Sequence, residues 1–298
     1  MYINGVLIDD TFAEAFPMAY SKLIITADTP ALAMQAAQAA AGMAISIIGC
    51  NCESGLGEIL EPAVTPDARP GQVLWLYSYS AEKLEEQLFF RIGQAILPSA
   101  TSACFNGLES PLTCKPGAKL RYFGDGFQSS KLLEGRRLWR IPVADGEFVL
   151  DESFGIGEGV GGGNLLMMGI DRKIALEAAE AAVVAIRKVP GAIAPFPGGI
   201  CRSPSKPKGK YANVPASTNQ VFCPTLRSRV ETRLTPDAHA VYELVIDGDS
   251  LECVTTAMAS AIRVACRLGI TQVTAGNYGG KWGKYHIYLH QILQEEPA

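Results

Sequence analysis

The stretch Lys22-Leu23-Ile24-Ile25-Thr26, followed by Asp28-Thr29-Pro30 and the alanine-rich run Ala31–Ala41, decides the fold class of this chain. The apolar run predicts a strand. Asp28 or Thr29 as the N-cap, with Pro30 in the first turn, predicts the start of a helix. Gly42 is a helix stop signal, and the apolar run Ala44–Ile48 after it predicts a second strand. The stretch therefore predicts one β-α-β unit.

The same order of elements occurs three more times along the chain. It runs through Val73–Tyr77, Ala81–Arg91 and Gln94–Leu97; through Asn164–Met168, a helix from Asp171 to about Lys188, and Ala192–Pro195; and through Val241–Ile246, Leu251–Arg267 and Thr271–Ala275. Two such units that share one antiparallel sheet form a split βαβ, or ferredoxin-like, arrangement. We therefore predict an α+β protein of two ferredoxin-like lobes from an internal duplication, with lobes at residues 1–155 and 156–298. One doubly wound sheet is the alternative.

The middle of the chain favours two lobes over one doubly wound sheet, because its pattern is typical of an insert of short strands. The runs Leu120–Phe123, Arg137–Val143 and Glu147–Leu150 are separated by turn-forming residues. Asp145-Gly146 between two apolar runs is a strong hairpin signal. We expect a β-hairpin insert within the first lobe.

Charge and hydropathy exclude several classes of protein. The 298 residues carry 26 Lys and Arg against 30 Asp and Glu, a net charge of −4, whereas a nucleic-acid-binding protein normally has a basic excess. The most membrane-like stretch, Ala31–Cys50, is interrupted by Gln35 and Gln38 and is better explained as a core helix that leads into a strand. The first residues do not resemble a signal peptide, so we expect a cytoplasmic protein with reduced thiols.

Two patterns resemble cofactor or metal sites but lack essential parts. Gly157–Gly162 matches G-x-G-x-x-G, yet it leads into an apolar strand rather than a helix, so we expect a flexible linker instead of a nucleotide site. Cys50 and Cys52 lack further ligands at close spacing. His286 and His290 lack the glutamate of the zincin pattern. We predict no metal site.

The segment between Pro195 and Arg229 is the most polar part of the chain. Long loops inside compact domains are usually functional, although a solvated connection is the alternative. Its glycines offer backbone N–H groups, and its cations suit an anionic substrate. The candidate substrate-binding residues here are Phe196, Pro197, Gly198, Gly199, Arg202, Ser205, Lys206, Ser217, Thr218 and Asn219.

Glu243 is the one acid in the apolar run Val241–Ile246. By alternation it shares a face with Val241 and Val245 and is expected to point inward. A buried carboxylate is costly unless it is paired or protonated, and such groups are often tuned for acid–base chemistry. A charge placed on an edge strand for solubility is the alternative.

Several motifs together resemble one family across nearly the whole chain. They are Asn4-Gly5-Val6, Asp10–Phe16, Phe123-Gly124-Asp125-Gly126-Phe127, Ile141-Pro142-Val143, Gly146-Glu147-Phe148, Ala194–Ile200, Ala216–Asn219, Cys223–Arg227, Tyr242–Ile246 and Ala275–Lys281. In this order they resemble the formylmethanofuran:tetrahydromethanopterin formyltransferases. Gly49–Glu53 and Gly161–Leu166 look more like the bacterial members, which form the formyltransferase subunit of a formyltransferase/hydrolase complex. The chain departs from the family pattern at Ser110–Lys119.

The resemblance implies a reversible formyl transfer between N5 of tetrahydromethanopterin and the amine of a methanofuran-type cofactor. It implies that Glu243 is the catalytic acid and base, and that these two compounds are substrates, with no permanently bound cofactor. It adds Asn277, Gly279, Gly280 and Lys281 to the substrate-binding candidates. It also implies a homotetramer, with further subunits of the complex as possible partners. The alternative is a non-catalytic ferredoxin-like scaffold or regulatory subunit.

Overall fold

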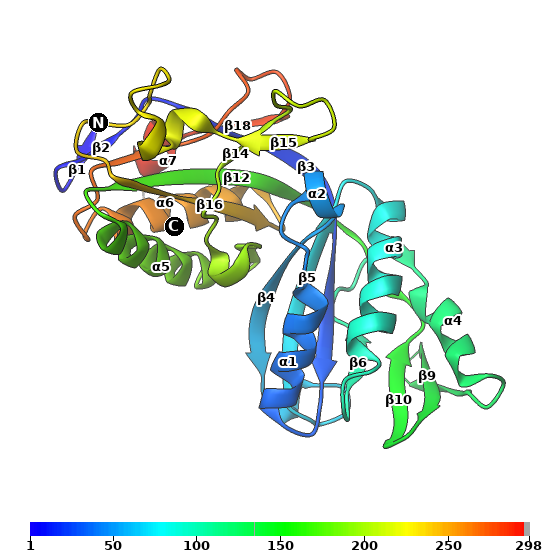
Figure 1. Cartoon of the computed structure of the whole chain (residues 1–298). Helices are drawn as coiled ribbons and strands as arrows, with labels where there is room; N and C mark the ends of the chain where they lie inside the picture. Colours follow the sequence, from blue (N-terminus) through cyan, green and yellow to red (C-terminus); the bar gives the residue numbers. More distant parts are fainter. Residues whose placement is uncertain (134, 295–298) are drawn as a thin grey trace. The chain divides into compact units, whose positions relative to one another are not determined.

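The structure, a computed structural model, describes residues 1–133 and 135–294 (Figure 1). It is a mixed α/β protein with parallel and antiparallel strand pairs. The chain divides into two compact units: Met18–Glu158, and Met1–Pro17 together with Gly159–Ala298. Among the described residues, no helix has both the length and the apolar character that a membrane span requires.

The unit Met18–Glu158 is built on one sheet. Its strand order is β4 (Glu53–Leu60), β5 (Gly71–Ser78), β3 (Phe12–Thr26), β6 (Ala103–Asn106), β10 (Gly146–Asp151), β9 (Arg136–Val143) and β8 (Ser129–Leu133). Neighbouring strands are antiparallel except for the β6–β10 pair. Shorter elements are α2 (Ile47–Cys50), η1 (Pro62–Val64), η2 (Ile92–Ile96), β7 (Thr113–Cys114), α4 (Pro116–Leu120), η3 (Arg121–Gly124) and β11 (Phe154–Gly155).

Two helices of this unit, α1 (Pro30–Ala41) and α3 (Ala81–Arg91), pack against β5. Thr29 and Ser80 cap them, each accepting a backbone N–H of the first turn through its hydroxyl oxygen. Leu84 and Leu88 lie four residues apart on α3 and are fully buried against the sheet. The predicted N-cap Thr29 and both predicted helices are confirmed.

Three strands predicted in this unit are wrong. Ala44–Ile48 leads into the short helix α2, and the return strand is β4. Gln94–Leu97 belongs largely to the π-helical turn η2 that continues α3, and the return strand is β6. Leu120–Phe123 is helical. A short apolar run fits a buried helix as well as a strand, which is why periodicity failed here. The hairpin of β9 and β10 is confirmed.

The second unit carries a sheet in the order β13 (Ala192–Ile193), β16 (Ala240–Gly248), β12 (Gly157–Gly169), β17 (Gln272–Thr274), β2 (Val6–Ile8) and β1 (Tyr2–Ile3). Strand β18 (Tyr285–Tyr288) pairs with the first residues of β3. Helices α5 (Arg172–Arg187) and α6 (Leu251–Ala265) lie side by side on one face of this sheet (Figure 1). Asp171 and Ser250 cap them.

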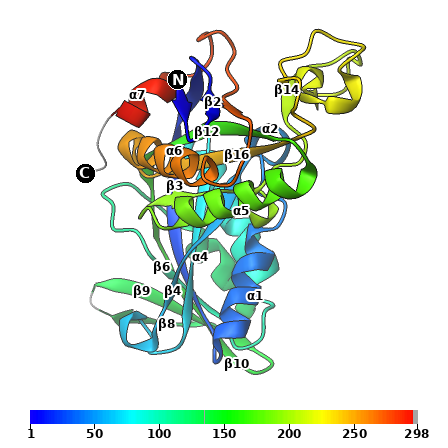
Figure 2. The same cartoon turned by 90° about the vertical axis from the view of Figure 1, so that its left-hand side faces the viewer.

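The opposite face of β12 and β16 is covered by the long segment between β13 and β16. Leu166 and Met168 of β12 pack there against Phe222, Leu234 and Ala238. Figures 1 and 2 show β14 (Ser205–Pro207) and β15 (Ala216–Thr218) on the side of β12 away from α5. The remaining elements of this unit are η4 (Pro197–Gly199), η5 (Gln220–Phe222), η6 (Pro224–Leu226) and α7 (Leu289–Gln294).

The glycine-rich stretch predicted as a flexible linker is part of β12, so that prediction is wrong. Gly162 has a φ of 87°, lies in a register shift between Val160 and Gly163, and donates its N–H to Asp247 Oδ1 at 3.0 Å. A Cβ on Gly163 would lie 2.6 Å from a methyl of Val254. The glycines therefore form a bulge and allow a close approach to α6 within a strand.

Candidate functional site

Glu243 lies in β16 on the sheet face that the segment between β13 and β16 covers. Leu244 and Ile246 point to the helices and are fully buried, whereas Glu243 is half-buried on the opposite face. Its backbone forms an antiparallel bridge with Cys201, with N–H···O distances of 2.8 and 3.0 Å. Glu243 shares its face with Val241 and Val245 as predicted, but that face is half-buried and is not the fully buried face of β16, so the predicted inward orientation is confirmed only in part. The edge-strand alternative is wrong, because the backbone of Glu243 is paired on both sides, with Leu166 and with Cys201.

Side chains from β12 and from the segment after η4 contact the Glu243 carboxylate. Asn164 of β12 donates through Nδ2 to Glu243 Oε1 at 3.3 Å. The Cys201 thiol forms a side-chain hydrogen bond with the same carboxylate. Burial, followed by the Glu243 charge, raises the pKa of the Cys201 thiol to about 11. The thiol therefore stays protonated at neutral pH and remains a donor toward Glu243.

The loop that follows β17 is joined to this site through Asn164. Asn164 Oδ1 accepts the backbone N–H of Gly276 at 2.8 Å. The next residue, Asn277, donates its side-chain amide to the Phe12 carbonyl at 3.0 Å and to Thr11 Oγ1 at 3.2 Å. The start of the loop is thus fixed by one asparagine from β12 and one of its own.

The rest of this loop is held by one buried carboxylate, that of Glu14. The residue is only 2% exposed, and its side chain accepts four backbone N–H groups. Oε1 accepts from Tyr278 at 2.7 Å and Gly280 at 2.6 Å; Oε2 accepts from Trp282 at 3.1 Å and Gly283 at 2.6 Å. Burial alone would raise the pKa of Glu14, but the four donors outweigh it and the pKa is lowered. Glu14 is therefore a permanent anion at neutral pH.

The structure brings together one part of the predicted substrate site around this loop. Gly279 and Gly280 have φ angles of 72° and 74°, the left-handed region where glycine is preferred. Lys281 is exposed. The rings of Tyr278 and Trp282 stack at a centroid distance of 4.7 Å on the outside of the loop.

A second part of the predicted site lies between β13 and β15. Phe196 precedes the turn η4 (Pro197–Gly199), which leads to Cys201 and so to the backbone of Glu243. Gly199 has a φ of 86°, and a Cβ there would lie 2.7 Å from Val183. Arg202 is exposed.

The remaining candidates form a separate two-stranded sheet. Ser205 pairs with Thr218, and Lys206 with Ser217. The Ser217 hydroxyl donates to the Lys208 carbonyl at 2.6 Å, and Asn219 donates its N–H to the Pro204 carbonyl at 2.9 Å. These contacts stabilise the hairpin. Lys206 is half-buried and Thr218 is exposed.

The residues considered for metal binding do not assemble into a site. All eight cysteines are free, and the described residues contain no group of three His, Cys, Asp or Glu side chains placed to hold a metal ion. His290 Nε2 lies 2.8 Å from the Ile8 carbonyl oxygen, and His286 is exposed.

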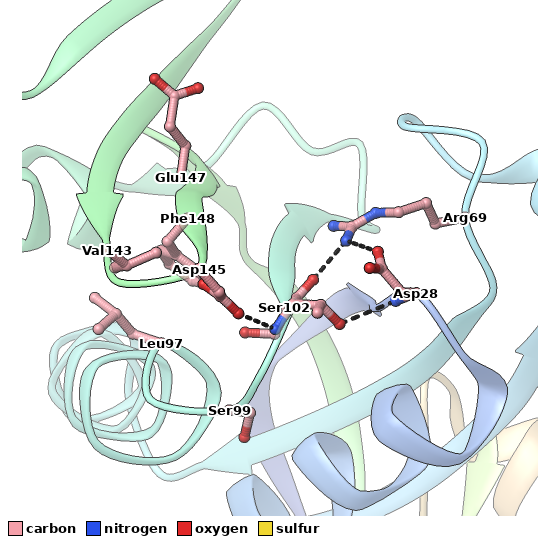
Figure 3. A pocket seen from close by; sticks show the side chains of 10 residues that line it. Asp28, Arg69, Leu97, Ser99, Ser102, Val143, Asp145, Glu147 and Phe148 are labelled. Atoms are coloured by element: carbon pink, nitrogen blue, oxygen red, sulfur yellow. Dashed lines mark hydrogen bonds and ion pairs between the residues drawn. The ribbon is translucent and has the colours of Figure 1, made fainter.

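A cleft of about 120 Å³ lies in the unit Met18–Glu158 (Figure 3). It is lined by Asp28, Arg69, Leu97, Ser99, Thr101, Ser102, Val143, Asp145, Glu147 and Phe148. Several of its charged groups are paired with each other or with backbone. Arg69 donates to Asp28 at 2.9 Å, and Asp145 accepts the Thr101 N–H at 2.8 Å. The cleft contains none of the predicted substrate-binding residues.

The arrangement around Glu243 suits proton transfer. A half-buried carboxylate, oriented by two donors and flanked by glycine-containing segments with backbone N–H groups, can take and return a proton beside a bound substrate. Sequence reasoning missed three residues that support it: Asn164, Cys201 and Glu14. For Asn164 and Glu14 the sequence does contain a signal, namely a polar side chain within an otherwise apolar run, Asn164–Met168 and Phe12–Phe16.

Comparisons with known proteins agree over the full length of the chain. The family model for formylmethanofuran-tetrahydromethanopterin formyltransferase matches residues 1–143, and the model for the proximal lobe of the same family matches residues 146–292. The chain is 48% identical to the formylmethanofuran–tetrahydromethanopterin formyltransferase of Methylococcus capsulatus, over 98% of this chain and 100% of that protein.

Two solved structures are closely similar. A chain of the formyltransferase/hydrolase complex from Methylorubrum extorquens, solved in complex with methylofuran, superposes with a TM-score of 0.94 at 45% identity, over 100% of this chain and 99% of that one. The formylmethanofuran:tetrahydromethanopterin formyltransferase of Methanosarcina barkeri gives a TM-score of 0.91 at 43% identity, over 98% and 100%. This chain belongs to the formylmethanofuran–tetrahydromethanopterin formyltransferase family.

Proposed function

We propose that this chain catalyses the reversible transfer of a formyl group between N5 of tetrahydromethanopterin and the amine of a methanofuran-type cofactor. The observation that carries the proposal is the Glu243 carboxylate, half-buried in an apolar strand and contacted by Asn164 and Cys201. Membership of the formyltransferase family supports it. A non-catalytic scaffold has no need of an oriented carboxylate, and that alternative is not favoured.

The reaction is an acyl transfer between two nitrogen atoms. The attacking nitrogen forms a bond to the formyl carbon and loses its proton to Glu243, which gives a tetrahedral intermediate. Glu243 then returns the proton to the other nitrogen as its bond to the carbon breaks. One carboxyl group therefore serves as base and then as acid. Backbone N–H groups at Gly198-Gly199 and Gly279-Gly280 are candidates to contact the substrates.

The direct test is an activity assay on the purified chain. It is mixed with 5-formyl-tetrahydromethanopterin and a methanofuran-type amine, and the formylated amine is measured by mass spectrometry. Formation of the formylated amine at a rate proportional to the amount of chain supports the proposal. No transfer in either direction by a folded, oligomerically intact protein would refute it.

We also propose that Arg202 and Lys206 hold anionic parts of a substrate. Loss of one charge-assisted contact costs about 1.5–3 kcal/mol of binding, or roughly a 10- to 150-fold change in affinity. We therefore expect Arg202→Ala to raise KM by about tenfold or more and to leave kcat nearly unchanged. Steady-state kinetics measure both constants. The exposed Lys210 provides the matched control: Lys210→Ala should change neither. An unchanged KM for both substrates in Arg202→Ala would remove Arg202 from the site.

The proposed architecture is two ferredoxin-like lobes that arose by duplication, at residues 1–155 and 156–298. The strand orders β4-β5-β3-β6 and β13-β16-β12-β17 support this, because both place the second, third, first and fourth strands of a βαββαβ run side by side. Met1–Pro17 belongs to the same compact unit as Gly159–Ala298. The first 17 residues thus accompany the second lobe.

We propose that the chain forms a homotetramer and that other subunits of a formyltransferase/hydrolase complex can join it. The chain is 48% hydrophobic and only 19% charged. The side chains of Tyr122, Phe123 and Phe127 are 65%, 65% and 81% exposed. Contact of these apolar rings with water is unfavourable, and burial between subunits would remove it.

We also propose a cytoplasmic location, because the eight free thiols fit a reducing compartment.

The oligomer proposal predicts a particle several times heavier than one chain. Light scattering on the purified protein at micromolar concentration should give about four times the mass of the 31.8 kDa chain. Phe127→Ser should favour smaller species, whereas the same change at a buried position would mainly lower stability. A stable particle of 31.8 kDa would contradict the proposal.

A further inference from the structure

Asn164 is the side chain that connects Glu243 to the loop after β17. It lies in β12 opposite Val245 of β16 and is half-buried beside fully buried apolar residues of the same strand. Its Oδ1 accepts the N–H of Gly276 at 2.8 Å, and its Nδ2 donates to Glu243 Oε1 at 3.3 Å. One amide group thus makes both contacts at once.

The two contacts fix the orientation of the Asn164 amide. The backbone N–H of Gly276 can only donate, so the group that faces it must be the carbonyl oxygen, which accepts. The NH₂ group therefore faces Glu243. If the amide were flipped, a donor would oppose a donor at Gly276 and an oxygen would oppose a carboxylate at Glu243. The strand pairing thus keeps a donor aimed at Glu243.

The geometry also favours glycine at position 276. A Cβ there would lie 2.9 Å from Asn164 Nδ2, closer than side-chain atoms normally approach. A larger residue would require the Asn164 amide, the group that contacts Glu243, to shift.

From these contacts we propose that Asn164 is a positioning residue for the transfer reaction: it orients Glu243 for proton exchange and fixes the start of the loop Asn277–Gly283 at the same time. This inference rests on the proposed function, because it takes Glu243 as the acid and base. Asn164 acts through Glu243 and needs no contact with the reacting atoms.

The experiment separates the two contacts with a single substitution. Asn164→Asp keeps an oxygen that can accept the Gly276 N–H, but it replaces the donor toward Glu243 with a second carboxylate oxygen. Like charges at this distance raise the pKa of one member of the pair. Glu243 must be deprotonated to accept the proton, so the acid limb of the kcat–pH profile should move to higher pH by about one unit or more.

A second variant tests the same contact without adding charge. Asn164→Ala removes the donor that favours the carboxylate form of Glu243, so the acid limb should move in the same direction by less. The titratable group that faces Glu243 from the segment after η4 is Cys201, and its thiol stays protonated until about pH 11. It does not titrate within the acid limb.

The matched control is Asn106, in the unit Met18–Glu158. Its side chain also bridges backbone groups, accepting the Gly155 N–H at 2.9 Å and donating to the Leu108 carbonyl at 2.8 Å. Asn106→Asp should lower the melting temperature without a shift of the acid limb. If both Asn164 variants kept the wild-type acid limb, Asn164 would be a structural residue only and the inference would fail.

Failure of this inference is distinguishable from failure of the proposed function. Glu243→Gln is assayed alongside. If its kcat falls while the Asn164 variants show unshifted profiles, only the role of Asn164 is wrong. If Glu243→Gln retains wild-type kcat, the proton-transfer role of Glu243 is wrong and the Asn164 inference falls with it.

Discussion

Glu243→Gln is expected to lower kcat about 10²- to 10⁴-fold, the usual size of a general acid–base contribution. Glutamine retains the shape of the side chain and can still accept from Asn164, so the fold and the KM values should change little. In the proposed mechanism, the variant loses the carboxyl group that takes a proton from one nitrogen and gives it to the other. Steady-state kinetics and a melting curve on the purified variant measure these effects.

If Glu243 has only a structural role, we expect the opposite effects on kcat and on the melting temperature of this variant. In that case the melting temperature would fall and kcat would stay within a few-fold of wild type. The control is Glu177→Gln on α5, whose side chain is exposed and whose loss should affect neither quantity. Near-wild-type turnover in Glu243→Gln would end the assignment.

Glu14→Gln should cause the largest loss of stability. Two of the four backbone donors would face an amide NH₂ group instead of a carboxylate oxygen. Each hydrogen bond to a charged group contributes about 1.5–3 kcal/mol, so we expect the free energy of unfolding to fall by about 3 kcal/mol or more. KM should also rise, because the loop that carries Asn277–Lys281 loses its anchor. Denaturant unfolding and steady-state kinetics test this.

The pH dependence of stability identifies the carboxylate as the cause. The pKa of Glu14 is lowered in the folded state, so its contribution is fully present above the ordinary pKa of the unfolded carboxyl, about 4.5. That contribution is lost as the pH falls through the lower, folded pKa. The stability difference between wild type and Glu14→Gln should therefore be constant near neutral pH and shrink in acid. The exposed Glu158 is the control. A difference independent of pH would contradict the argument.

The helices were predictable because their signals are local. The N-caps Thr29, Ser80, Asp171 and Ser250 lie within three residues of the N–H groups that they accept. The return strands of the first two β-α-β units were not predictable, because short apolar runs fit several structures. The glycines of β12 were misjudged for a different reason. Their small size allows close packing, as at Gly163 against α6. Such packing involves residues far apart in the sequence and cannot be predicted from the local pattern.

For the candidate site, Glu243 could be proposed from the sequence, but the residues around it could not. Glu243 stands out as a charge in an apolar strand. Its partners Asn164 and Cys201 lie 79 and 42 positions away and meet it only through the strand register. Pairings over such separations depend on the fold as a whole.

The Glu14 anchor determines the order in which the chain can assemble during synthesis. Glu14 is synthesised before Gly283, the last residue whose N–H group it accepts, and 269 residues separate the two. At roughly 5–20 residues per second the delay is on the order of tens of seconds. The continuous unit Met18–Glu158 can complete its sheet during that time. Met1–Pro17 belongs to the unit that also contains Gly159–Ala298, and most of that segment has not yet been synthesised. The segment Met1–Pro17 is therefore made before the unit Met18–Glu158 but reaches its native contacts after it.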